Sequence, residues 1–260
     1  MDFGMPVLIE NKNVQDNIAL CRKLGLDFLE LNMNLPEYQA DKLEDIAYFK
    51  KLAEEAGIYY TIHLDENLNI ADFNISVSDA YMETTARTIN VAKLLNVPVL
   101  NIHINHGVHF TLPDRKVQLF EEYFNDYIRK FQEFKSLCEK SIGGSGIKIC
   151  IENTDGFRDY EKAVIKMLLE SDVFALTWDI GHSNSSSNID EGFIMQNEGK
   201  LKHFHLHDSA GSKDHMTLGT GEIDLKARIG IARKHNCRCV IETKTIKSLE
   251  QSVLWLRKNI

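Results

Sequence analysis

The feature that most constrains the fold is an alternation of short apolar runs with longer segments of helical spacing, which continues along the whole chain. The short runs are rich in β-branched and aromatic residues, as buried strands are, and the longer segments repeat apolar residues every three or four positions, as helices do. Strand-then-helix repeats build parallel sheets. Eight such runs occur, which is the strand number of a closed (β/α)8 barrel.

The predicted strands are Phe3–Val7 or Val7–Ile9, Phe28–Leu31, Ile58–Leu64, Val97–Ile104, Ile147–Ile151, Phe174–Trp178, Leu201–Leu206 and Arg238–Ile241. The predicted helices are Val14–Leu24, Leu43–Ala56, Asp79–Leu95 with Ser78 as its N-cap, Asp114–Lys140, Tyr160–Leu169, Glu191–Gly199, Leu225–Lys234 and Leu249–Arg257. Ser183–Asn188 is expected to be a surface loop, because it is the one low-complexity patch.

An open, doubly wound sheet is the alternative for such a repeat. It favours a GxGxxG or GxxxxGK[ST] turn after an early strand, and the chain contains neither motif. A chain of 260 residues also matches the size of one barrel. We therefore predict an α/β fold, a (β/α)8 TIM barrel that forms a single domain over residues 1–260.

Composition limits the class of protein. Hydrophobic residues make up 43% of the chain and charged residues 26%, as in a soluble globular protein. No apolar run of roughly 18 residues and no secretory N-terminus is found, so we expect a cytoplasmic protein. The five cysteines contain no CxxC pair, which argues against a zinc ribbon. The net charge of −8 argues against nucleic acid as a partner.

Polar residues recur where the predicted strands end. They are Glu30, His63, His103, Glu152, Asp179, His205 with His207, and Glu242. In a barrel these ends converge on one face, where the active site lies. Clustered buried carboxylates are costly unless a cation neutralises them, so the pattern predicts a metal. Carboxylate and imidazole ligands suit Zn, Mn, Co or Mg.

Several short motifs occupy these strand ends in a fixed order. They are Ile-His-Leu at His63, Asn-Ile-His at His103, Ile-Glu-Asn-Thr at Glu152, Trp-Asp-Ile-Gly-His from Trp178, His-Leu-His-Asp-Ser from His205, Leu-Gly-Thr-Gly-Glu-Ile-Asp from Leu218 and Ile-Glu-Thr at Glu242. Over nearly its whole length the chain resembles the xylose isomerase-like barrels. These include sugar isomerases and epimerases, inosose dehydratases and endonuclease IV.

The resemblance implies that Glu152, Asp179, His205 and Glu242 bind the shared metal, and that His182 contacts substrate or a further zinc.

The first functional hypothesis is a metal-dependent isomerase or epimerase of a small sugar, sugar phosphate or polyol. In it, Glu152 and Glu242 act as paired base and acid around a metal-stabilised enediolate. His182 and Lys213 steady hydroxyls or oxyanion charge. A hydride shift or a dehydration, and a phosphorylated substrate contacting Arg158 or Lys244, stay open.

The second hypothesis is an abasic-site DNA nuclease similar to endonuclease IV, whose zinc ligands His63, His103 and His215 match by position. Lys213 departs from that pattern, because the nuclease has an aspartate there. The loops 65–78, 183–192 and 209–224 contain one lysine against many carboxylates, although DNA binding needs basic loops. A third possibility is a barrel that binds a metal or ligand without catalysis. The oligomeric state stays open, with a homo-oligomer as one possibility.

Overall fold

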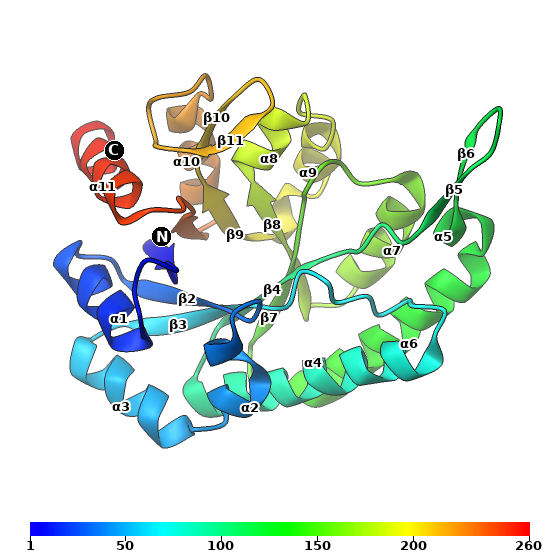
Figure 1. Ribbon diagram of the computed structural model, residues 1–260, viewed down its shortest axis with the longest axis horizontal. Helices are drawn as coiled ribbons and strands as arrows, with labels where there is room; N and C mark the ends of the chain where they lie inside the picture. The colour runs from blue at the N-terminus through cyan, green and yellow to red at the C-terminus, as the bar shows by residue number, and fades with distance from the viewer.

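The computed structural model describes all residues from Met1 to Ile260 and contains a closed barrel of parallel strands surrounded by helices (Figure 1). The barrel strands are β1 (Asp2–Pro6), β2 (Phe28–Asn32), β3 (Tyr59–His63), β4 (Val99–His103), β7 (Lys148–Glu152), β8 (Phe174–Asp179), β9 (Leu201–Leu206) and β12 (Arg238–Ile241). Each pairs with the next one along the chain, and β12 pairs with β1 to close the ring. The predicted (β/α)8 barrel is confirmed.

The helices cover the outside of the barrel (Figure 1). They are α1 (Val14–Lys23), α2 (Ala40–Leu43), α3 (Ile46–Ala56), α4 (Ile75–Leu95), α5 (Leu119–Glu122), α6 (Phe124–Ile142), α7 (Asp159–Leu169), α8 (Ile180–Ser185), α9 (Glu191–Gln196), α10 (Leu225–Lys234) and α11 (Ile246–Asn259). No helix is both long and apolar enough to span a membrane.

Two small hairpins extend from the barrel. One pairs β5 (His109–Thr111) with β6 (Lys116–Gln118) and projects into solvent beside α5, and the other pairs β10 (Asp208–Ala210) with β11 (Lys213–Met216) close to α8 (Figure 1). The second hairpin follows β9, so it lies on the barrel face where the strands end.

The barrel interior changes from apolar to polar along the strands. Successive side chains of a strand point to opposite faces. Every second residue of a barrel strand therefore points into the barrel. Val99, Cys150 and Ala175 form a small apolar cluster of their own. Two positions further along, Asn101, Glu152 and Thr177 are buried and polar. The polar layer begins inside the barrel and leads to its open end.

One predicted helix was wrong over its first part. Residues 114–118 lie in the projecting hairpin rather than in a helix, where Leu112 N–H bonds Arg115 C=O across the turn. Pro113 and Asp114 stand at the turn between the two strands, and both residue types favour tight turns. Helical structure starts at Leu119, and a break at Tyr123 separates α5 from α6.

Four other boundaries differ from the sequence-based prediction. Helix α4 begins at Ile75 with Asn74 as N-cap, because buried Ser78 donates instead to the Ile70 carbonyl. Residues 183–185 belong to helix α8, so Ser183–Asn188 is not wholly a loop. Val7–Ile9 is not a strand, since β1 ends at Pro6. The predicted helix Leu43–Ala56 is interrupted at 44–45, where Asp45 caps α3.

Candidate functional site

The four predicted metal ligands converge at the C-terminal end of the barrel. Glu152 ends β7, Asp179 ends β8, His205 lies on β9, and Glu242 directly follows β12. One donor atom from each residue lies within 4.8 Å of the donor atoms of the other three. The side chains of Glu152, Asp179 and His205 are almost fully buried, and that of Glu242 is 14% exposed.

His205 lies at the centre of this group. Its Nδ1 atom lies 3.0 Å from Glu152 Oε1, 2.9 Å from Glu242 Oε2 and 3.9 Å from Asp179 Oδ2. Zinc ligands lie about 2.0–2.2 Å from the ion, so ligand atoms roughly 3–4 Å apart can share one. Glu242 Oε2 is buried without a hydrogen-bond partner. Three neighbouring carboxylates and an imidazole fit a divalent cation.

The electrostatics of the group follow from this crowding. Burial raises the pKa of Glu152, but the positive charges of His205 and His103 outweigh burial and hold the pKa well below its usual range. Burial is likewise outweighed at Glu242, where His205 and Lys244 keep the pKa well below its usual range. Burial lowers the pKa of His205, yet Glu152, Glu242 and Glu30 raise it well above normal. Both glutamates are therefore ionised and available as ligands or bases.

Neighbouring amides and hydroxyls hold the carboxylates in place. Asn101 donates its side-chain amide to Glu152 Oε2 and accepts from the Thr177 hydroxyl. Asn153 joins β7 to β8, since it accepts from Asp179 N–H and donates to the Asp179 carbonyl. No sequence motif singles out these supporting residues. Their signal is positional, because Asn101 precedes His103, and Thr177 precedes Asp179, by two residues on the inward face.

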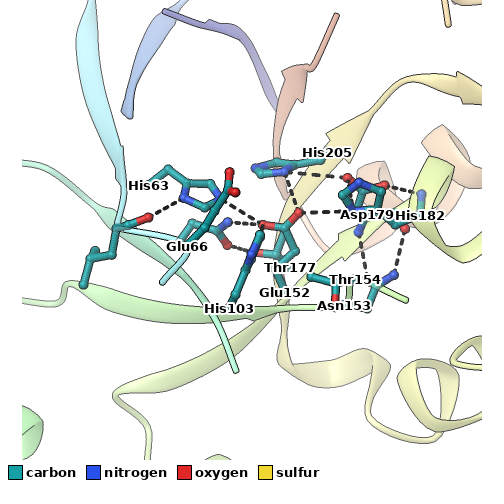
Figure 2. A network of polar contacts seen from close by, with 12 residues as sticks. His63, Glu66, His103, Glu152, Asn153, Thr154, Thr177, Asp179, His182 and His205 are labelled. Atoms are coloured by element: carbon teal, nitrogen blue, oxygen red, sulfur yellow. Dashed lines mark hydrogen bonds and ion pairs between the residues drawn. The ribbon is translucent and has the colours of Figure 1, made fainter. Parts of the chain in front are cut away.

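The Trp-Asp-Ile-Gly-His motif forms the first turn of α8. Asp179 is the N-cap, and its Oδ1 accepts the His182 N–H at 2.7 Å. The His182 ring folds back toward the same carboxylate, with Nδ1 3.2 Å from Asp179 Oδ2 (Figure 2). The side chain is 19% exposed, so it lies at the entrance of the site rather than beneath it.

His63 and His103 approach Glu152 from the opposite side. Their Nε2 atoms lie 3.3 Å and 3.1 Å from Glu152 Oε2, the oxygen not directed at His205 (Figure 2). The three residues form a second group able to hold an ion. Burial lowers the pKa of His63, but Glu152 more than compensates and raises the pKa to about 9. Glu152 therefore contacts His205 through Oε1 and both His63 and His103 through Oε2.

The hairpin β10–β11 brings His215 but not Lys213 to the site. His215 adopts a left-handed backbone conformation with φ of 49°, and its ring packs 4.2 Å from the ring of His207 and 5.2 Å from that of His182. Lys213 is exposed. Its neighbour Asp214 faces the site instead, with Oδ2 3.9 Å from His182 Nε2.

His207 is already bonded at both ring nitrogens. Its Nδ1 accepts the His215 N–H at 2.8 Å, and its Nε2 lies 3.0 Å from the Asp179 carboxylate. The group His182, His207 and His215 could hold an ion by distance alone. However, the His207 nitrogen that binds the ion would first have to release its present partner, the His215 N–H at Nδ1 or the Asp179 carboxylate at Nε2.

A cavity of about 300 Å³ adjoins Glu242. It is lined by the polar residues Asn32, Asn34, Glu66, Thr243 and Lys244 together with apolar residues after β1. Lys244 is its only cation, and its Nζ lies 2.7 Å from Glu242 Oε1. The other cation considered from sequence, Arg158, is bound to Asp155. Neither cation is free.

Comparison with known proteins agrees with this architecture. The chain is 24% identical over 267 residues to an inosose isomerase of Bacillus velezensis, covering 94% of this chain and 88% of that protein. A crystal structure of a D-tagatose 3-epimerase-like protein superposes with a TM-score of 0.79 at 21% identity, covering 99% and 96% of the two chains. That of an IOLI protein with a bound zinc atom superposes at 0.72 and 18% identity, covering 99% and 96%.

The match to a family extends over most of the chain. Residues 18–259 match the xylose isomerase-like TIM barrel, and this range contains every strand except β1 together with all of the converging side chains. The chain belongs to the xylose isomerase-like TIM barrel family.

Proposed function

We propose that the protein is a divalent-metal-dependent isomerase or epimerase of a small sugar or polyol. The observation that carries the proposal is the placement of Glu152 and Glu242 on two sides of His205 Nδ1, at 3.0 Å and 2.9 Å. Moving a proton beside a carbonyl needs one group to remove it and another to return it. One ionised carboxylate would remove the proton, and the other carboxyl, once it carries a proton, would return one.

The residues that would hold the cation are Glu152, Asp179, His205 and Glu242. When bound, a divalent ion supplies Lewis-acid stabilisation of negative charge developing on a substrate oxygen. The IOLI protein similar to this chain carries zinc, and the donor set also suits manganese, cobalt or magnesium. His182 at the entrance would orient a hydroxyl, because its exposed ring edge is the part that substrate can reach.

The substrate class follows from the cavity. Its lining offers amide, hydroxyl and carboxylate groups that bind sugar hydroxyls. Its one lysine is already paired with Glu242, so a phosphate would have to compete with that carboxylate. An uncharged polyhydroxy ketone or aldehyde suits the cavity better, in accord with the sugar and inosose activities named for the similar proteins.

The first experiment measures solvent-deuterium incorporation into a panel of ketoses and inososes. Either Glu152→Gln or Glu242→Gln is expected to lower exchange by about 10²–10⁴-fold, the usual contribution of a general acid or base. Glu250→Gln is the control, because Glu250 forms an exposed ion pair with Lys23 on the barrel exterior. Chelation should abolish exchange and added divalent ion should restore it. Full exchange in Glu242→Gln would overturn the acid–base assignment.

A second candidate function is a zinc-dependent phosphodiesterase acting on abasic DNA. One observation favours it: the Nε2 atoms of His63 and His103 lie 3.3 Å and 3.1 Å from Glu152 Oε2. The bonded state of His207 opposes a further ion in the group of His182, His207 and His215. Elemental analysis with an abasic-duplex nicking assay separates the two. About three zinc ions per chain with nicking would replace the sugar proposal.

A further inference from the structure

Beneath the candidate metal site lies a second buried polar group, which lies outside the cavity and shares only His205 with the cation-binding set. It consists of Glu30 on β2, Thr61 on β3, and His203 and His205 on β9. Glu30 is 2% exposed, Thr61 and His203 are fully buried, and His205 is 1% exposed. Because β2 and β9 are not neighbours in the barrel, this contact crosses its interior.

The two oxygens of Glu30 face different partners. Oε1 lies 3.0 Å from Nε2 of His205. Oε2 lies 2.9 Å from Nε2 of His203 and accepts the Thr61 hydroxyl at 2.8 Å. A buried carboxylate is costly unless donors or positive charge surround it. Thr61 and His203 form hydrogen bonds with Oε2, and the His205 ring lies in ion-pair contact with Oε1. The carboxylate is thereby held toward the back of the His205 ring.

The front of the same ring faces the candidate metal ligands. Nδ1 of His205 lies about 3 Å from both Glu152 and Glu242. A neutral imidazole carries one proton, and it can bind a cation only through the nitrogen that lacks it. A carboxylate at Nε2 draws the proton to that side and leaves the Nδ1 lone pair directed at the site. Without Glu30, the carboxylates at Nδ1 would favour the opposite, non-ligating tautomer.

We propose that Glu30 is a positioning residue that sets the tautomer and ring orientation of His205 for metal binding. This inference rests on the metal site of the proposed function but not on the reaction. In known metal sites, losing the group behind a ligating histidine weakens metal binding by about 10–100-fold.

The test measures zinc and manganese dissociation constants of the metal-stripped full chain by competition with a chromophoric chelator. Glu30→Gln is expected to weaken binding by about 10–100-fold, and Glu30→Asp by less. Thr85→Val is the matched control, because Thr85 is a buried threonine of α4 whose hydroxyl bonds the Tyr81 carbonyl and touches neither Glu30 nor His205. It should lower the Tm of the metal-stripped protein while leaving the dissociation constants within about threefold of wild type.

The inference would be overturned if Glu30→Gln lowered the Tm but kept its metal dissociation constants within threefold of wild type. Glu30 would then have only a structural role. Should Glu30→Gln fail to fold, Glu30→Asp and ¹⁵N spectra of the wild type decide. A His205 proton on Nε2 in the zinc-loaded protein supports the inference, and a proton on Nδ1 overturns it. Zinc binding without proton exchange in any sugar would sink the proposed reaction alone. Exchange with unaltered affinity in Glu30→Gln would sink this inference alone.

Discussion

At the scale of single residues, His207 links a candidate ligand to the loop that covers the site. Its ring bridges the Asp179 carboxylate and the backbone of His215. Gly181 makes room for that ring, because a Cβ at this position would lie 2.0 Å from His207 Nδ1 and Cε1. The glycine of the Trp-Asp-Ile-Gly-His motif is therefore explained by packing, because the motif lies against His207, the residue that directly follows β9.

Gly181→Ala is expected to destabilise the protein by about 1–3 kcal/mol, the usual cost of overpacking a filled interior. Gly192→Ala is the control, since its Cβ would meet nothing within 4 Å and Gly192 lies in helix α9. That substitution should be neutral or stabilise by a few tenths of a kcal/mol. Urea denaturation of both variants measures the difference. Equal stabilities of the two variants would contradict the packing explanation.

At the scale of elements, Asp208 organises the loop between β11 and α10. Its carboxylate accepts backbone N–H groups from Gly219 and Gly221 at 2.9 Å and 2.8 Å, and from Ser209 and Ile223 at 3.0 Å and 3.3 Å. A Cβ on Gly221 would lie 2.3 Å from the Ser209 carbonyl oxygen. The Leu-Gly-Thr-Gly-Glu-Ile-Asp segment is thus a loop wrapped around one carboxylate, and it borders the site through hairpin β10–β11.

Asp208→Asn is expected to cost about 1–3 kcal/mol, because hydrogen bonds to a charged acceptor are lost and an amide N–H₂ is turned toward other donors. The loop 217–223 should also become more sensitive to limited proteolysis. Asp214→Asn serves as the control, since Asp214 lies on the same hairpin with its side chain 37% exposed. Thermal unfolding and protease digestion of the pair give the measurement. Unchanged protease resistance in Asp208→Asn would refute the loop assignment.

At the scale of the whole molecule, we expect stability to depend on pH through a contact remote from the candidate ligands. His106, after β4, lies 2.5 Å from both the buried Glu161 on α7 and Asp155. Burial lowers the pKa of His106, but Glu161 and Asp155 outweigh burial and raise the pKa above its ordinary value. A contact of this kind ties the loop after β4 to the segment between β7 and α7.

The sign of the pH effect follows from the raised pKa. The contribution of His106 to stability is fully present below the unfolded-state pKa of about 6.5 and is lost as the pH rises through the folded-state pKa. The free energy of unfolding lost in His106→Gln should therefore be larger at pH 6 than at pH 9. His109→Gln, at an exposed position, should show no such trend. A pH-independent difference for His106→Gln would count against the ion pair.

Much of the fold could be predicted because it depends on local pattern. The eight apolar runs became the eight barrel strands to within a few residues, since period and flanking turns decide a buried strand locally. The errors lie where another contact competed with local preference. Ser78 bonds Ile70 instead of capping a helix, and the segment after Val108 folds into a hairpin around Pro113.

The sequence alone determined the barrel and identified the strand-end residues Glu152, Asp179, His205 and Glu242, because parallel strands must bring their ends to one face. It could not determine which imidazole nitrogen or carboxylate oxygen contacts which neighbouring residue. Only the tertiary structure placed Glu30 behind His205, His207 against Asp179 and Lys213 in solvent. Those contacts join residues far apart in the chain, and their geometry depends on barrel closure and side-chain packing, which no local pattern encodes.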